Sequence, residues 1–502
     1  MADLQQSISR ASAILAGERL CRLPVDRLQE LRELAVHPPI DAGGGPGLRG
    51  EALRLLRRGL RSPIAEYRGR IAAYLQREMI QSIARDCPVD GTLPELVYLA
   101  PFDVLSRNGG AARVLGLAEA LAGFYQVSVV SLVGSGRQPL ALPLAPNARI
   151  YFAPVPKVLE LAVEKNRKVY GGAAYSLTLA ESWPLLDIAS YWVSSLLSRA
   201  RVLLLNQPYL WPLAQHFRGP KTALVYDVPE VNRFFTLRFA GPQADQARVT
   251  TLQAELEGAT CREAHIIAMA SQMDSEVLCK EQGGSIQQKL RIVPNGVWVD
   301  RGTYCPAPQK QRLKRCCELE SFLTVFLGSP GYGPNLDAVE YIINTLAPAH
   351  PDHRFVVIGM GADDRTADGL VPGNVHFVGR VSEDVKSAIL AMSDLALAPM
   401  QYDSGSSLKI PDYISHGTPV VATPHGLRGF EALTSLAVVA ERSAFAAAYQ
   451  ETAARIQAQP LEVEKWIGEM KAVVKKHYDW SVIGAAYAEA IPTNSQMESS
   501  PS

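Results

Sequence analysis

From residue 95 onward, apolar runs alternate with segments that have helical spacing. ELVYLAP (95–101) and QVSVVSLVG (126–134) are apolar runs of the kind found in strands that are covered on both faces. The segment between them carries apolar residues three and four positions apart, which predicts a helix over 111–123. This order predicts an α/β protein with parallel sheets. Further strands of the same half are expected at Arg201–Leu205, Ala223–Tyr226 and His265–Met269.

The same pattern begins again at Phe322, which indicates a second α/β domain. SFLTVFLGSPGYGPNLDAVEYIINTLAP (321–348) has the order strand, glycine-rich loop, helix. Further strands are expected in RFVVIGMG (354–361), NVHFVGRV (374–381) and LALAPM (395–400). A chain of 502 residues is too long for a single core, so two domains are expected on length as well.

The most informative stretch runs from Leu395 to Glu431. We expect a buried strand at Leu395–Ala398, a polar loop at Gln401–Ser407, a helix at Leu408–His416 and a second strand at Val420–Thr423. The loop follows the carboxyl end of a strand, which is where open α/β sheets bind their ligands.

The residues of this loop and helix suit a phosphorylated ligand. Gly405, Ser406 and Ser407 bring small side chains and backbone N–H groups to a helix N-terminus, where anions bind. Lys409 adds a positive charge, and Asp412 lies one turn later, where its carboxylate could accept hydrogen bonds from ribose hydroxyls. A capped helix with a solvated Lys–Asp pair is the alternative reading.

Residues 1–92 do not follow the α/β pattern and are expected to form a helical extension. The stretch 51–84 is amphipathic and rich in arginine. It could rest on an anionic membrane surface or bind an acidic protein, although a helix docked on the rest of its own chain is the simpler interpretation. The last residues, 492–502, have the composition of a disordered tail.

Composition and charge narrow the class of protein. Fifty basic residues balance fifty acidic ones, so nucleic acid is not suggested as a partner. Seven cysteines without a Cys-x-x-Cys pair suggest neither a disulfide framework nor a zinc site. No apolar run reaches the roughly 20 residues that span a bilayer. We therefore expect a cytoplasmic protein, with peripheral contact at the inner face of the membrane as the alternative.

A resemblance to a known family adds to this reading. GSSLKIPDYISHGTPVVATPHGLRGFE (405–431) resembles the donor-binding signature of family 4-like glycosyltransferases, glycosyl transferases group 1. Lys409 would match the family's lysine that contacts the donor phosphates, and Asp412 would take the place of the glutamate that holds the ribose. The family's first glutamate, eight positions earlier, is replaced by Ser404, and the neighbouring Asp403 is the alternative carboxylate.

Other segments resemble the same family in the same order. Asn108-Gly109-Gly110 resembles its Gly-Gly loop on the acceptor side, although on sequence grounds alone a tight turn explains these residues equally well. These glycines do not fit Gly-x-Gly-x-x-Gly, so a nicotinamide or flavin cofactor is not expected. DVPEVN (227–232) resembles a segment in which Asp227 and Glu230 would meet the acceptor, although Asp227 could instead cap the following helix. VPNGV (293–297) resembles the close of the first domain.

The resemblance implies a GT-B fold, with two facing Rossmann-like domains. The implied order is a helical extension (1–92), an acceptor-side domain (93–300), a linker (301–320), a nucleotide-sugar domain (321–475), a helix crossing back (476–491) and the tail (492–502). The remaining implied donor-site residues are Gly328, Ser329, Gly331, Gly359, Arg380 and Val381.

The function that the resemblance implies is transfer of a sugar from a nucleotide-diphosphate sugar to a hydroxyl of a glycan, a lipid-linked sugar or a protein. Asp227 and Asp403 are the catalytic candidates. The reaction is expected to retain the anomeric configuration and to need no metal and no cofactor besides the donor. Polysaccharide or glycoprotein assembly is the expected setting. A nucleotide-sugar epimerase and a catalytically silent interaction module are the alternatives.

Overall fold

The computed structural model describes residues 92–106, 108–137, 140–184, 191–316, 321–329, 331–361, 370–402 and 405–492. They form two compact units. The N-terminal unit comprises residues 92–293 and 484–492, and the C-terminal unit comprises residues 294–483. The predicted helical extension up to Gly91, the tail from residue 493, and Asp403 and Ser404 lie outside the described residues.

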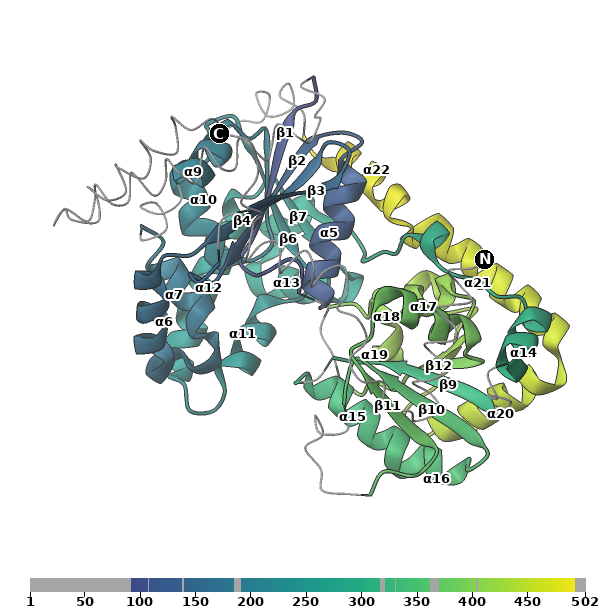
Figure 1. Ribbon diagram of the computed structural model, residues 1–502. Coiled ribbons are helices and arrows are strands. Elements are labelled where there is room, and N and C mark those ends of the chain that lie inside the picture. Colours follow the sequence, from purple (N-terminus) through teal and green to yellow (C-terminus); the bar gives the residue numbers. More distant parts are fainter. Residues whose placement is uncertain are drawn as a thin grey trace, which may run out of the picture. The chain divides into compact units, whose positions relative to one another are not determined.

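The N-terminal unit is built on an eight-stranded sheet with the order β3-β4-β2-β1-β5-β6-β7-β8 (Figure 1). Neighbouring strands are parallel except for β3, which pairs antiparallel with β4. The strands are β1 (Glu95–Ala100), β2 (Gln126–Val133), β3 (Leu140–Ala145), β4 (Ala148–Pro154), β5 (Val202–Leu205), β6 (Ala223–Val228), β7 (Ile266–Met269) and β8 (Leu290–Ile292).

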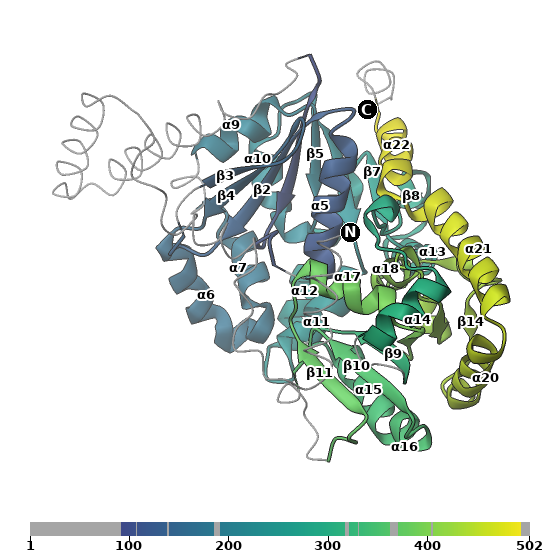
Figure 2. The same ribbon diagram turned by 45° about the vertical axis from the view of Figure 1, so that its right-hand side comes forward.

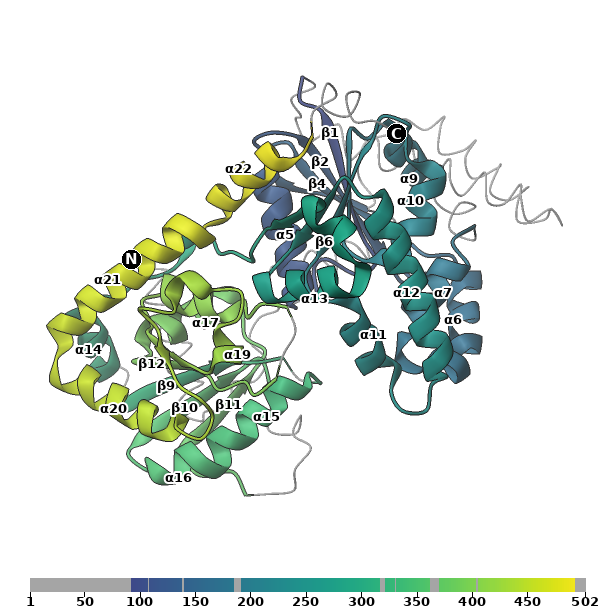
Figure 3. The same cartoon turned by 180° about the vertical axis from the view of Figure 1, so that it is seen from behind.

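Helices cover both faces of this sheet. Tyr226 and Asp227 are successive residues of β6 and point to opposite faces. Tyr226 bonds to Glu257 of α12 and Asp227 to Arg113 of α5, so these two helices lie on opposite faces (Figures 1 and 3). The helices of the unit are α5 (Gly109–Leu121), α6 (Lys157–Tyr170), α7 (Ala174–Glu181), α9 (Tyr191–Arg199), α10 (Trp211–Phe217), α11 (Asn232–Ala240), α12 (Gln246–Glu263) and α13 (Gln272–Gln282).

The C-terminal unit has a six-stranded, fully parallel sheet with the order β11-β10-β9-β12-β13-β14. The strands are β9 (Phe322–Leu327), β10 (His353–Ile358), β11 (Val375–Gly379), β12 (Leu395–Ala398), β13 (Val420–Ala422) and β14 (Val438–Val439). The helices are α14 (Ala307–Cys316), α15 (Gly333–Tyr341), α16 (Ala347–Ala349), α17 (Glu383–Met392), α18 (Lys409–Ser415), α19 (Pro424–Leu427), α20 (Phe445–Ala458), α21 (Pro460–Tyr478) and α22 (Trp480–Ala490), the last of which runs on into the N-terminal unit.

Two apolar cores separate on the faces of this second sheet because strand side chains alternate. Val325 of β9 packs with α17, α18 and α21, whereas the next residue, Phe326, packs with α15, α16 and α20. Figure 2 shows α17 and α18 on one side of this sheet and α15 and α16 on the other. The apolar runs without alternation in the sequence are thus explained by burial on both faces. No helix among the described residues is both long and apolar enough to cross a lipid bilayer.

Each sheet has a point where the strand order reverses direction. In the C-terminal unit this point lies between β9 and β12, and in the N-terminal unit between β1 and β5. The connections that leave such neighbouring strands go to opposite faces of the sheet, which leaves a crevice at their carboxyl ends. Ligand sites are therefore expected after Leu327 and Ala398 in one unit and after Ala100 and Leu205 in the other.

Within the expected linker 301–320, residues 307–316 form the helix α14, and the described residues 301–316 belong to the C-terminal unit. α14 buries Lys310 and Lys314. Lys310 Nζ donates to the backbone oxygen of Ser393 at 2.7 Å, and Lys314 pairs with Asp394. The polar composition predicted a linker because the partners of these two lysines, Ser393 and Asp394, lie about 80 positions later in the sequence. The units divide between Val293 and Pro294 rather than after residue 300.

Candidate functional site

Lys409 lies beside the crevice of the C-terminal unit. It is the first residue of α18, the helix that follows β12. Its Nζ donates to Asn335 Oδ1 at 2.9 Å and lies 4.5 Å from the centroid of the Phe326 ring. Asn335 belongs to α15 and Phe326 to β9. The ammonium group, which comes from the β12 side of the strand-order reversal, therefore meets groups from the β9 side.

A buried tyrosine fixes the helix that carries Lys409. Tyr413 of α18 is fully buried, and its hydroxyl accepts the backbone N–H of Leu327 at 2.7 Å. Leu327 is the last residue of β9, so the bond joins α18 to the strand end at the crevice. Burial raises the pKa of Tyr413, which keeps the hydroxyl neutral. The position of Lys409 is thus set by the core rather than by a surface loop.

Two glycines bring backbone close together at the ends of β9 and β10. Gly359 has φ +94°, and a Cβ there would lie 2.7 Å from the backbone oxygen of Gly328. A Cβ on Gly328 would lie 2.6 Å from the Phe326 ring. Side chains at either position would clash, so glycine is required there. Ser329 and Gly331, the other predicted residues of this loop, are exposed.

The loop before α18 is held by its own neighbours. Ser406 Oγ accepts from Asn295 Nδ2 at 2.7 Å, and a Cβ on Gly429 would lie 2.2 Å from Ser406 Cβ. Gly405 has φ +74°, and Ser407 is buried. Small residues are thus required here for packing as well as for any ligand. Asp403 and Ser404 lie outside the described residues.

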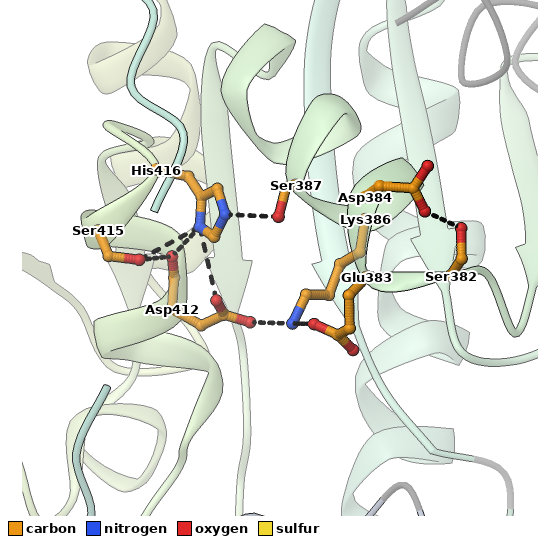
Figure 4. A network of polar contacts seen from close by, with 8 residues as sticks. All are labelled: Ser382, Glu383, Asp384, Lys386, Ser387, Asp412, Ser415 and His416. Carbon is orange, nitrogen blue, oxygen red and sulfur yellow. Dashed lines mark hydrogen bonds and ion pairs between the residues drawn. The ribbon is translucent and has the colours of Figure 1, made fainter. Parts of the chain in front are cut away.

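Asp412 faces α17 rather than Lys409. Its Oδ2 lies 3.0 Å from Lys386 Nζ, and Lys386 also pairs with Glu383 at 2.7 Å (Figure 4). On the other side, His416 Nδ1 donates to the Asp412 backbone oxygen at 2.8 Å. The side chains of Lys386 and Asp412 keep 22% and 19% of their surface exposed.

Arg380 and Val381 lie between β11 and α17. Arg380 is exposed. Val381 is buried in the core that includes Val325, so its side chain contributes to packing. The resemblance assigns a nucleobase contact to the backbone of these residues, and that assignment stays a prediction.

Asp227 occupies a place different from the one expected. It is fully buried, and Arg113 donates to both of its carboxylate oxygens, with Nη2 2.6 Å from Oδ1. Tyr98 donates its hydroxyl to the same carboxylate. Burial is the main cause that raises the pKa of Tyr98, and the negative charge of Asp227 raises it further. A carboxylate enclosed in this way cannot contact an acceptor in this structure.

Asp227 does not cap the following helix either. The N-cap residue of α11 is Val231, with no side-chain hydrogen bond. Arg113 also donates to the backbone oxygen of Val293, the last residue before the chain leaves the unit. Asp227 therefore belongs to a buried structural ion pair, and its candidacy as a catalytic residue is corrected accordingly.

The remaining residues predicted on the acceptor side follow β1 and β6 of the N-terminal unit. Asn108 is the N-cap of α5, and its Oδ1 accepts the N–H of Ala111 at 2.9 Å. Gly109 and Gly110 are the first residues of that helix rather than a separate turn. Glu230 is half-buried between β6 and α11. The exposed N-terminus of α5 follows β1, one of the two strands at the reversal.

Sequence reasoning missed three residues that the structure brings to these crevices. Asn335 and Lys386 bond to the predicted Lys409 and Asp412. Asn206 directly follows β5, is fully buried, and has no partner for either side-chain amide atom among the described residues. A polar residue at a strand end beside a strand-order reversal is a signal that could have found Asn206, because unpaired buried amides are rare.

Comparisons with known proteins agree with this architecture. Residues 321–455 match the family model of glycosyl transferases group 1. No curated protein sequence matches the chain.

Solved structures resemble the chain over most of its length. Sucrose-phosphate synthase from Thermosynechococcus elongatus is similar with a TM-score of 0.60 and 16% identity, over 79% of this chain and 98% of that one. The UDP-forming α,α-trehalose-phosphate synthase from Burkholderia vietnamiensis gives 0.56 and 14%, over 79% and 99%. Anabaena HepE in complex with UDP gives 0.56 and 14%, over 79% and 98%.

These likenesses confirm the predicted fold, and the family model confirms the enzyme class. The C-terminal unit carries a glycosyl transferases group 1 domain at residues 321–455, and the chain is a glycosyltransferase with the GT-B fold.

Proposed function

We propose that the chain transfers a sugar from a nucleoside diphosphate sugar to a hydroxyl acceptor, with the donor bound at the crevice of the C-terminal unit. The observation that carries the proposal is the position of the Lys409 ammonium group. Asn335 and Phe326 fix its ammonium at the strand-order reversal, where α/β sheets bind nucleotides. A diphosphate is a fitting ligand for an ammonium group held at this position, because charge-assisted hydrogen bonds to phosphate are strong.

The spacing of the charged residues also suits a nucleoside diphosphate. Lys409 and Asp412 are three residues apart on α18, which corresponds to about 5–6 Å between side-chain origins. We assign Lys409 to the diphosphate and Asp412 to the ribose hydroxyls. Gly328 and Gly359 would let the backbone of β9 and β10 approach the donor.

Departure of the diphosphate is the demanding part of sugar transfer, because negative charge builds up on the leaving group. A cation fixed before the reaction stabilises that charge without reorganisation. Lys409 supplies this cation in our proposal, and we expect transfer without a bound metal. We further propose retention of the anomeric configuration, which rests on the family resemblance and is tested by the anomeric signals of the product in NMR.

For the acceptor we propose the crevice of the N-terminal unit. Asn206 and the N-terminus of α5 lie at the two strands where the order reverses. The unpaired amide of Asn206 could both donate to and accept from a sugar hydroxyl. A glycan or a lipid-linked sugar fits this chemistry, and a protein acceptor is the further possibility to be tested by substrate screening.

Thermal stability in the presence of nucleotides tests the donor site. We would compare the purified chain with UDP, GDP, dTDP and CDP and with their sugars. A ligand that binds only the native state raises the melting temperature by mass action. UDP comes first, because the structure of Anabaena HepE is a complex with UDP and the similar trehalose-phosphate synthase is UDP-forming. Absence of a shift with every nucleotide would contradict the proposal.

Product analysis separates the other classes of function. A transferase releases the nucleoside diphosphate and extends an acceptor. An epimerase returns an isomer of the nucleotide sugar, and a silent interaction module binds without turnover. The family match favours the transferase.

A further inference from the structure

An ion pair joins Lys386 of α17 to Asp412 of α18, and the inference drawn from it rests on the proposed donor site. Asp412 is assigned to the ribose, yet in this structure its Oδ2 already pairs with Lys386 at 3.0 Å (Figure 4). The two residues come from neighbouring helices that begin after β11 and β12. A ligand that reaches the Asp412 carboxylate therefore meets the Lys386 ammonium as well.

Lys386 is a cation held in a largely enclosed position. Burial opposes its charge, but the carboxylates of Asp412 and Glu383 outweigh burial and raise its pKa above the ordinary value. An ammonium has three N–H groups, and Glu383 and Asp412 accept from Nζ at 2.7 and 3.0 Å. One donor therefore has no acceptor among the described residues.

Asp412 keeps capacity for a ligand in spite of these contacts. A carboxylate has about four acceptor positions. Lys386 takes one on Oδ2, and His416 Nδ1 lies 3.5 Å from Oδ1. His416 is oriented in turn, because Nδ1 donates to a backbone oxygen and Nε2 accepts from Ser387 Oγ at 3.0 Å. Lys386 therefore holds the carboxylate on one side, and acceptor positions remain for hydroxyl donors.

We propose that Lys386 is part of the nucleoside-binding site, where it holds the Asp412 carboxylate for the ribose hydroxyls and donates its third N–H to a ribose oxygen. Lys409 recognises the diphosphate, and the Lys386–Asp412 pair recognises the ribose. Affinity for the two parts of the donor should therefore respond to different substitutions.

The test measures binding by calorimetry for Lys386→Met and for the control Glu383→Gln. Glu383 is the more exposed partner, with 66% of its side chain accessible, and its substitution leaves the Lys386–Asp412 pair in place. The probes are inorganic pyrophosphate, whichever of UDP, GDP, dTDP and CDP stabilises the wild type most, and the 2′,3′-dideoxy form of that nucleotide. Thermal unfolding first establishes that each variant is folded.

We expect Lys386→Met to weaken nucleotide binding about tenfold, as loss of one charge-assisted hydrogen bond would. Pyrophosphate binding should change less than about twofold, and so should binding of the dideoxy nucleotide, which lacks the hydroxyls concerned. Glu383→Gln should leave all three affinities near those of the wild type. Lys386→Gln is a second variant, and its amide can still donate its two N–H groups to Glu383 and Asp412, which favours folding. No N–H group then remains for the ribose, so the same loss of nucleotide affinity is expected.

Two results would overturn the inference. One is unchanged nucleotide affinity in Lys386→Met and Lys386→Gln. The other is an equal loss for nucleotide, dideoxy nucleotide and pyrophosphate, which would indicate a structural role. Failure of the proposed function looks different: no nucleotide binds the wild type, or Lys409→Met leaves pyrophosphate binding intact.

Discussion

Replacing Lys409 with methionine removes the charge at the centre of the proposed donor site and keeps most of the side chain. The methionine stem can still lie over Phe326 and against Met400, whose Sδ is 3.8 Å from Lys409 Nζ. The ligand-free protein loses the cation–π attraction between the ammonium and the Phe326 ring, about 0.5–1 kcal/mol. It also loses the bond to Asn335, about 1 kcal/mol. We therefore expect a folded variant that is about 1–2 kcal/mol less stable.

The effect on nucleotide binding should be larger. A charge-assisted hydrogen bond to phosphate contributes about 1.5–3 kcal/mol, so the Kd should rise roughly 10- to 150-fold. At a nucleotide concentration of about 100 times the wild-type Kd, the wild type gains about 2.7 kcal/mol of stability. A variant with a Kd about 30 times higher gains only about 0.9 kcal/mol.

Isothermal titration calorimetry measures the Kd directly, and thermal unfolding with and without nucleotide checks the linked stability. Lys475→Met is the matched control, because Lys475 is exposed and pairs with Asp300 on the same unit. Its Kd should equal that of the wild type. A folded Lys409→Met protein that binds the nucleotide within about twofold of the wild type would refute the reasoning.

Three further predictions concern other residues. Asn206→Leu should leave the melting temperature unchanged or higher, because it removes an unpaired buried amide, yet raise the acceptor KM; a normal KM with a lower melting temperature would assign Asn206 to folding alone. Burial raises the pKa of Glu257 from 4.5 to about 7, so the folded chain holds an extra proton between these values and stability falls by about 3 kcal/mol as the pH rises through them. Urea unfolding at low and high pH should show this slope in the wild type and a flatter one in Glu257→Gln; equal slopes would contradict the assignment. Gly359→Ala should destabilise the chain more than Gly331→Ala in the same urea assay, because both have positive φ but only Gly359 faces a backbone oxygen at 2.7 Å; equal losses would count against a close approach of the two strands.

The strands and the Lys409 loop could be predicted from sequence because their signals are local. The apolar runs at Leu395–Ala398 and 420–422 are strands, and the helix between them differs from the expectation by one residue at each end. Strands β3 and β4 were not foreseen. β3 is an antiparallel edge strand interrupted by Pro143, and its half-exposed pattern lacks a continuous apolar run.

Contacts between distant residues explain what the sequence could not provide. Asp227 looked available at a strand end, but its enclosure depends on Arg113, 114 positions earlier. The polar residues of α14 predicted a linker, and only the fold shows that Lys310 and Lys314 bond to Ser393 and Asp394. Asn335 and Lys386 were missed for the same reason, because their bonds to Lys409 and Asp412 form only when the helices pack. Residue type indicated the chemistry, and only the fold showed which groups meet.

The central claim is that the donor diphosphate binds where β9 and β12 diverge. A crystal structure of the chain with the nucleoside diphosphate that stabilises it most tests this claim directly. The account predicts a phosphate oxygen within hydrogen-bonding distance of Lys409 Nζ and the ribose beside Asp412. A nucleotide bound elsewhere on the chain, with Lys409 Nζ still bonded to Asn335 and distant from every phosphate oxygen, would contradict it.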